Sequence, residues 1–182
     1  MLPFLRKRSI PTGPHEFGAE IEIERPASEV YPLLDFADPS NAKRELGDKV
    51  HAVAGTAGRF ELTVSALPDA VFALAVTAEQ VGREYAFSCV STPLFGNAAR
   101  SHERYVLEDF GDGCCKLILT NTVEFGGKLT EDEYQLEAMM LTFSCFSALA
   151  KLKIHAEQGA EAVKKLEREQ LAGLEDFECG LD

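Results

Sequence analysis

Hydrophobic and polar residues alternate along much of the first 125 residues of the chain. In the stretch FGAEIEIE, residues 17–24, every second position is apolar or small, which predicts a half-buried strand. Six later segments have the same strand character, and glycine, proline, aspartate or asparagine turns separate most of them. Because short turns join consecutive strands, we expect an antiparallel meander of seven strands. The six later segments are HAVAG, GRFELTVSAL, AVFALAVTAEQ, REYAFSCVST, ARSHERYVLEDF and CKLILTNTVEF.

Two short helices are expected between the first and second strands. The stretch RPASEVYPLLDF can form one, with Ser28 as its N-cap and Pro32 limiting its regularity. The stretch DPSNAKREL predicts the other, which ends before Gly47.

A long helix of about 28 residues is predicted from Thr130 towards Gly159, because Thr130 and Glu133 have the spacing of a capping box. Its apolar residues form two stripes, and we expect the first to face the sheet. The second stripe then needs another cover, either an N-terminal arm, Met1 to Leu5, or a neighbouring subunit in a homodimer. The first stripe is Leu136, Met139, Phe143, Phe146, Ala150 and Ile154, with Met140 at its edge, and the second is Tyr134, Ala138, Leu141, Cys145, Leu149 and Leu152.

Past Gly159, the segment EAVKKLEREQ is expected to extend the helix, and the acidic segment LAGLEDFECGLD to fray. The uncharged run AMMLTFSCFSALA within the long helix is shorter than the roughly 20 residues that a membrane span needs, so no transmembrane segment is expected.

Composition and charge limit the kinds of partner that we expect the protein to bind. The 182 residues are 46% hydrophobic, as in one globular domain, and 30 acidic against 18 basic side chains give a net charge of −12. A phosphate backbone is repelled by such a charge, so we do not expect a nucleic-acid partner. No export signal is visible, and the five cysteines are odd in number and lack metal-ligand spacing, so we expect reduced thiols and a cytoplasmic location.

Histidine positions and short motifs give no sign of a metal or a cofactor. His15, His51 and His155 have no metal-ligand spacing, and His155 falls on the polar side of the long helix, so each is interpreted as a surface residue. No phosphate-binding, dinucleotide-binding or hydrolase motif occurs in the chain. We therefore expect no cofactor and no metal site.

The order of elements and the stretch EIEIERPASEVYPLLDF resemble the START-like superfamily, also called SRPBCC or polyketide cyclase/dehydrase-like. The resemblance covers Phe17 to Gln158 and leaves residues 1–16 as an N-terminal arm and 159–182 as a helical extension with an acidic tail. It implies an α+β helix-grip fold, in which a curved, seven-stranded antiparallel sheet wraps around a long C-terminal helix. The chain departs from the pattern in having no tryptophan and in its extension after Gly159.

This resemblance also implies a cavity between the concave sheet and the helix. The helix wall would then be Met139, Met140, Phe143 and Phe146, and methionine suits a pocket of adaptable shape. The alternative is that these four residues only fill a core.

Alternation predicts which polar side chains face that cavity. Asn121 is two residues from Leu119 and should face inward with it, and Glu103 is two residues from Tyr105 and should likewise face inward. Tyr85 and Phe87 are inward in the preceding strand. A buried carboxyl is costly, which makes Glu103 a site candidate, although at the rim it would simply be solvated. A bulge would instead turn His102 and Arg104 inward. The predicted ligand-binding set is Tyr85, Phe87, Glu103, Tyr105, Leu119, Asn121, Met139, Met140, Phe143 and Phe146.

Three functional hypotheses follow. The first is a binding protein for a hydrophobic small molecule such as a lipid, a quinone or a polyketide-like aromatic. The second is a cyclase- or dehydratase-like enzyme in which Glu103 abstracts a proton beside a carbonyl while Tyr105 or Asn121 stabilises the enolate. The third is an interaction protein, like the co-chaperone branch of the superfamily, whose second helical stripe binds a partner.

Overall fold

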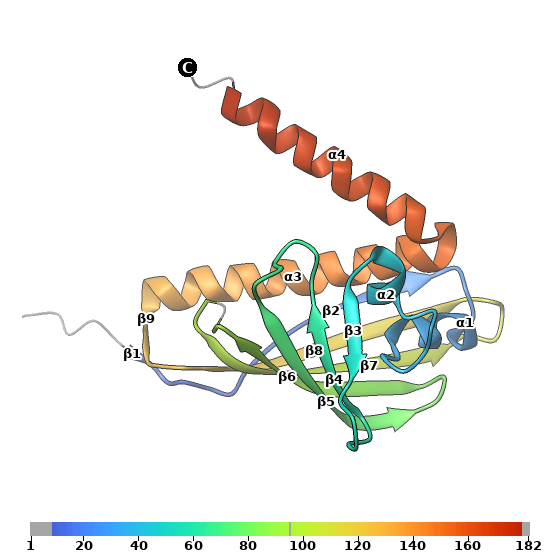
Figure 1. Cartoon of the computed structure of the whole chain (residues 1–182), viewed down its shortest axis with the longest axis horizontal. Coiled ribbons are helices and arrows are strands. Elements are labelled where there is room, and N and C mark those ends of the chain that lie inside the picture. The colour runs from blue at the N-terminus through green and yellow to red at the C-terminus, as the bar shows by residue number, and fades with distance from the viewer. Residues whose placement is uncertain (1–8, 95, 180–182) are drawn as a thin grey trace, which may run out of the picture.

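The main sheet of the protein has seven antiparallel strands in the order β2-β8-β7-β6-β5-β4-β3. The computed structural model describes residues 9–94 and 96–179 (Figure 1). Every strand after β3 pairs with the strand that precedes it in the chain, and β8 closes the order by pairing with β2. The predicted meander is therefore confirmed. The strands are β2 (His15–Ile23), β3 (Lys49–Ala52), β4 (Arg59–Thr63), β5 (Val71–Gln80), β6 (Glu84–Thr92), β7 (Ala98–Asp109) and β8 (Cys115–Phe125).

A second sheet of two strands lies at the start of the long helix. It pairs β1 (Ser9–Ile10) with β9 (Leu129–Thr130). The predicted arm is thus partly structured, and β2 begins two residues before Phe17. The arm segment from Met1 to Leu5 lies outside the described residues.

Two short helices follow β2, as predicted. They are α1 (Ala27–Leu34) and α2 (Ala42–Leu46). Ser28 is not the N-cap of α1, because the helix begins at Ala27 and Pro26 is in the N-cap position. Asn41 caps α2, and its side chain accepts a hydrogen bond from the backbone N–H of Lys43.

The long helix α3 (Glu131–Gln158) starts with the predicted capping box. The backbone N–H of Thr130 donates to Glu133 Oε2 at 2.7 Å, and the N–H of Glu133 donates to Thr130 Oγ1 at 3.3 Å. Gly159, with a positive φ of 87°, ends the helix. A separate helix, α4 (Ala160–Cys179), follows and rises away from the sheet (Figure 1). It continues through Cys179, where the sequence analysis expected fraying.

The face of α3 that packs on the sheet is the opposite of the predicted one. Phe143 is 72% exposed and Met139 is 64% exposed, whereas Cys145 and Leu149 are only 2% and 1% exposed. Leu136, Met140 and Phe146 are also exposed and Ile154 is half-buried, whereas the second stripe packs against the core.

This reversal overturns two further predictions. The stripe of Leu141, Cys145, Leu149 and Leu152 is covered by the protein's own core, so it offers no surface for a homodimer. For the same reason it cannot be the partner-binding surface of a co-chaperone-like protein.

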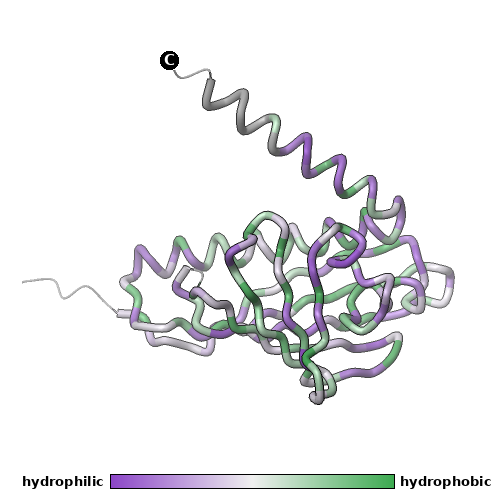
Figure 2. The backbone as a smooth tube through the Cα atoms, viewed as in Figure 1, coloured by the Kyte–Doolittle hydropathy of each residue, from purple (hydrophilic) through white to green (hydrophobic). Residues whose placement is uncertain are grey.

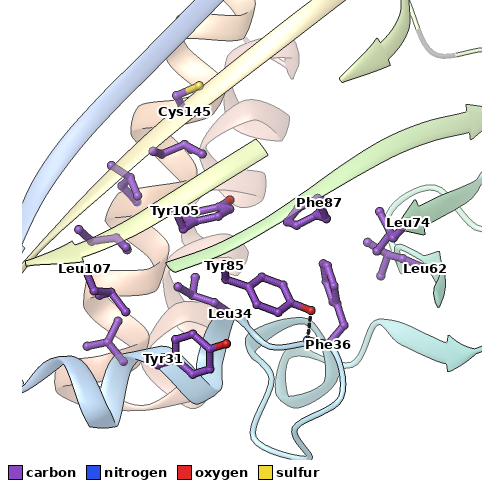
Figure 3. Close-up of a cluster of buried hydrophobic side chains, with 14 of the residues drawn as sticks. Tyr31, Leu34, Phe36, Leu62, Leu74, Tyr85, Phe87, Tyr105, Leu107 and Cys145 are labelled. Carbon is purple, nitrogen blue, oxygen red and sulfur yellow. Dashed lines mark hydrogen bonds between the residues drawn. The ribbon is translucent and has the colours of Figure 1, made fainter. Parts of the chain in front are cut away.

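The core joins the inner face of the sheet to α1 and the loop that follows it. Tyr85 is 1% exposed, and its hydroxyl accepts a hydrogen bond of 3.1 Å from the backbone N–H of Phe36 (Figure 3). The ring of Phe36 packs against those of Tyr85 and Phe87, with centroids 5.9 and 4.9 Å apart. Hydrophobic and polar positions alternate along the strands, as Figure 2 shows, and this alternation turns one face of the sheet towards this core.

Candidate ligand-binding cavity

A cavity of about 820 Å³ separates the inner face of the sheet from α3. Helices α1, α2 and α4 contribute further walls, and exposed residues such as Lys43, Ser65 and Gln170 mark its opening to solvent. The sheet and the helix therefore do not close completely on one another. Most of the lining is apolar, and it includes Leu33, Leu34, Phe36, Leu62, Val64, Phe72, Leu74, Phe87, Leu119, Val123, Leu141, Cys145, Ala148 and Leu152.

Three polar residues form a cluster on the sheet side of this cavity: Glu103, Tyr105 and Asn121, called the polar cluster below. Glu103 lies opposite Asn121 in the β7–β8 register and opposite Phe87 in the β6–β7 register. The hydroxyl of Tyr105 donates a hydrogen bond of 2.8 Å to Glu103 Oε2. The predicted inward orientation of all three residues is confirmed.

The alternative register, in which a bulge turns His102 inward, does not occur. The irregularity of β7 lies between Ala98 and Arg100, before the polar cluster. His102 Nε2 lies 2.9 Å from the hydroxyl of Thr77, on an exposed part of the sheet. Glu103 therefore faces the cavity, as the alternation of the strand predicts.

The carboxyl group of Glu103 is held in an environment that favours its neutral form. Burial raises its pKa, and the hydrogen bond from Tyr105 and the charges of Lys43 and His102 offset only part of this rise. Burial and the neighbouring carboxyl also raise the pKa of Tyr105 well above its usual range. Glu103 is half-buried in the cavity wall and is not a fully exposed residue at its rim.

Asn121 is the other unusual member of the cluster. Its side chain is buried, with 8% exposure, and its Oδ1 atom has no hydrogen-bond partner. A buried polar atom without a partner costs free energy, so it indicates either strain or a missing partner.

Two thiols lie beside this cluster, from opposite walls. Cys89 is on β6 and Cys145 is on α3. Burial, followed by the charge of Glu103, raises the pKa of each thiol to about 11. A raised pKa lowers the thiolate fraction of both residues at neutral pH and with it their reactivity.

Polar contacts between helices lie where α2, α3 and α4 line the cavity. His155 is buried, contrary to the sequence interpretation, and its Nε2 atom lies 2.7 Å from Glu45 Oε2 on α2. Lys151 on α3 donates to Glu167 Oε1 on α4 at 2.6 Å. His155 was assigned to the surface because helical periodicity alone does not show that α2 covers that side of α3.

The predicted ligand-binding residues divide into two groups. Phe87, Glu103, Tyr105, Leu119 and Asn121 line the cavity. Tyr85 does not, because it is part of the packed core. The four predicted helix residues, Met139, Met140, Phe143 and Phe146, lie on the exposed face of α3 and do not line the cavity.

The helix wall consists instead of residues that the sequence analysis placed in the second stripe or left unassigned. These residues are Leu141, Ser144, Cys145, Ala148, Lys151, Leu152 and His155.

Over the residues that the structure describes, no three His, Cys, Asp or Glu side chains gather closely enough to hold a metal ion. Within the same residues, no helix is both long and apolar enough to cross a membrane.

Known proteins resemble this chain in structure and not in sequence: no family model and no curated protein matches it. Ara h 8.0201 superposes with a TM-score of 0.59 at 16% identity, over 78% of this chain and 97% of its own. A START superfamily protein from Mycobacterium smegmatis gives a TM-score of 0.57 at 16% identity, over 79% and 98% of the two chains. CalU16 from Micromonospora echinospora gives 0.54 at 15% identity, over 92% of each chain. The protein therefore has the START-like, helix-grip fold, as the sequence predicted.

Proposed function

We propose that this protein binds a hydrophobic small molecule, such as a lipid, a quinone or a polyketide-like aromatic, in the cavity between the sheet and α3. The observation that carries the proposal is the cavity of about 820 Å³ with its largely apolar lining. Ligand pockets of proteins commonly measure about 300–1,000 Å³, with mostly apolar walls and a few polar groups. A ligand that buries apolar surface there gains about 25 cal/mol for each Å² removed from water.

A neutral apolar dye such as Nile red tests this proposal by fluorescence titration. We expect saturable binding of about one dye per chain in the wild type. Ala148 lines the cavity, so Ala148→Phe should weaken binding by tenfold or more by filling it. Ala150, two positions further along α3, is exposed, so Ala150→Phe is the matched control and should bind like the wild type. Equal affinities for all three proteins, or no saturable binding, would contradict the proposal.

A cyclase- or dehydratase-like enzyme is the second candidate, and the polar cluster is the observation that favours it. In its ionised form, Glu103 would take a proton from the carbon beside a carbonyl, and a hydrogen-bond donor would stabilise the enolate oxygen. The hydroxyl of Tyr105 already donates to Glu103, which leaves Asn121 as the donor for that oxygen.

Deuterium exchange at the carbon beside the carbonyl of a neutral aromatic ketone such as 2-tetralone, followed by NMR, tests this candidate. Wild-type protein should accelerate exchange, and Glu103→Gln should lose the acceleration without losing binding of the ketone. Exchange that is no faster than in buffer would leave only the binding function.

A further inference from the structure

The polar cluster carries an inference about the chemistry of the ligand, which rests on the proposed binding function. From the geometry of Asn121 and Glu103, we infer that the ligand is an uncharged apolar molecule bearing a hydroxyl group, an alcohol or a phenol, that is held between these two side chains. Two properties of the pair support this: the position of the two side chains and their unused hydrogen-bonding capacity.

The position of the pair lets one ligand atom reach both side chains. Glu103 and Asn121 are directly opposite each other on neighbouring strands, and both line the cavity. Opposite residues on one face of an antiparallel pair have Cβ atoms about 4.5–5.5 Å apart. A single oxygen atom placed above them is therefore within hydrogen-bonding reach of both.

Both side chains have hydrogen-bonding capacity that the protein does not use. Asn121 Oδ1 is buried and has no partner. Within the described residues, the hydrogen bond from Tyr105 reaches only one oxygen of Glu103, Oε2. A hydrocarbon packed against this pair would remove it from water without supplying a hydrogen-bond partner, which weakens binding of such a ligand.

A hydroxyl group matches this pair because it both donates and accepts a hydrogen bond. A half-turn of the Asn121 carboxamide exchanges its acceptor and donor ends, so either end can meet a hydroxyl. Glu103 can donate to the hydroxyl when neutral and accept from it when ionised. One hydroxyl group can therefore satisfy both residues in either protonation state of Glu103, with the Asn121 amide oxygen facing it when Glu103 is neutral and the amide nitrogen facing it when Glu103 is ionised.

A charged ligand group fits less well. A carboxylate beside Glu103 would be repelled by it or would add a second buried acid. Two lysines line the cavity, and each is already near a carboxylate: Lys43 Nζ is 3.9 Å from Asp48 Oδ2, and Lys151 Nζ is 2.6 Å from Glu167 Oε1. Arg100 also lines the cavity, from an exposed position, so an anion at the polar cluster is disfavoured by the carboxyl group of Glu103 and not by a lack of basic residues.

Three fluorescent probes of one shape test the inference: 1-pyrenemethanol, 1-methylpyrene and 1-pyrenecarboxylate. We expect wild-type protein to bind the alcohol about tenfold more tightly than the methyl compound, because one hydrogen bond that also satisfies a buried group is worth about that factor. Asn121→Leu keeps a similar volume and should reduce the ratio of the two affinities at least threefold. Glu103→Gln retains a hydrogen-bond donor and an acceptor, so this variant should keep most of the wild-type preference for the alcohol.

The outcomes separate the two proposals. If neither neutral pyrene binds to the wild type, both the binding function and the inference are overturned. If the methyl compound binds as tightly as the alcohol, or if the carboxylate binds most tightly, the hydroxyl inference is wrong while the binding function stands. The wild-type comparison alone decides these cases, so the test does not depend on the folding of a variant.

Discussion

The hydroxyl of Tyr105 donates a hydrogen bond of 2.8 Å to Glu103 Oε2, from two residues further along the same strand. Because residues two apart on a strand share one face, both groups point into the cavity. The hydrogen bond lowers the pKa of Glu103, but burial raises it by more. The cavity is therefore lined by a carboxyl group whose pKa is raised in the folded protein, and the stability of the fold should depend on pH for this reason.

Glu103→Gln should change how stability varies with pH. The pKa of Glu103 is higher in the folded protein than in the unfolded chain, where it is about 4.3. Between these two pKa values the folded state binds more protons, so the free energy of unfolding falls as pH rises through this window. The Glu103→Gln variant has no carboxyl group to titrate at this position. Its free energy of unfolding should therefore rise relative to that of the wild type as pH increases through this window.

Urea unfolding at several pH values between about 4 and 8 measures the effect. Glu124→Gln, on an exposed position of β8, is the control and should follow the wild-type curve. Parallel pH curves for Glu103→Gln and the wild type would show that burial does not perturb this carboxyl.

Substitutions on the two faces of α3 should have very different effects on stability. Leu149 is 1% exposed, and Leu149→Ala should cost about 2–5 kcal/mol through lost burial and the resulting cavity. Phe143 is 72% exposed, and Phe143→Ala should change the free energy of unfolding by only about 0.5 kcal/mol. Chemical denaturation of both variants checks this, and a larger cost for Phe143→Ala would reverse our assignment of the faces.

Tyr85→Phe should destabilise the protein without affecting the cavity. Its hydroxyl accepts the hydrogen bond from the N–H of Phe36, so its removal leaves a buried donor unsatisfied at a cost of about 1–3 kcal/mol. Tyr85 does not line the cavity, so Nile red affinity should stay at the wild-type value. A loss of affinity with unchanged stability would return Tyr85 to the ligand-binding set.

Cys145 should react slowly with iodoacetamide in the folded protein. Burial raises the pKa of its thiol to about 11, so at pH 8 its thiolate fraction is roughly a hundredfold below that of a free cysteine. Peptide mapping by mass spectrometry after timed alkylation, with urea-unfolded protein as the reference, measures the ratio. Bound ligand should slow the reaction further, since Cys145 lines the cavity. Equal rates in folded and unfolded protein would contradict this placement.

The strands and their inward faces could be predicted from the sequence because alternation has a period of two. Once Leu119 is inward, Asn121 must be inward too, and the regular pairing of β7 with β8 brings Glu103 opposite it. The long helix and its cap were likewise readable from Thr130 and Glu133.

The orientation of the long helix could not be predicted, because α3 has two apolar stripes and the stripe with the larger side chains is not the one that packs on the sheet. The stripe with methionine and phenylalanine has the larger side chains, yet it is exposed, and the second stripe, with Cys145 and Leu149, is buried against the core. Helical periodicity locates both stripes but does not show which of them the rest of the chain covers. The burial of His155 was unpredictable for a related reason, since it depends on where α2 lies.

Intermolecular nuclear Overhauser effects between bound 1-pyrenemethanol and labelled methyl groups test the central claim most directly. They distinguish the cavity from the exposed apolar face of α3, which a dye could also contact. We predict contacts to the methyl groups of Leu119, Leu141 and Leu152, which line the cavity, and none to those of Met139 and Met140. Contacts confined to the two methionines would contradict the account, because the ligand would then bind on the outer surface of the helix.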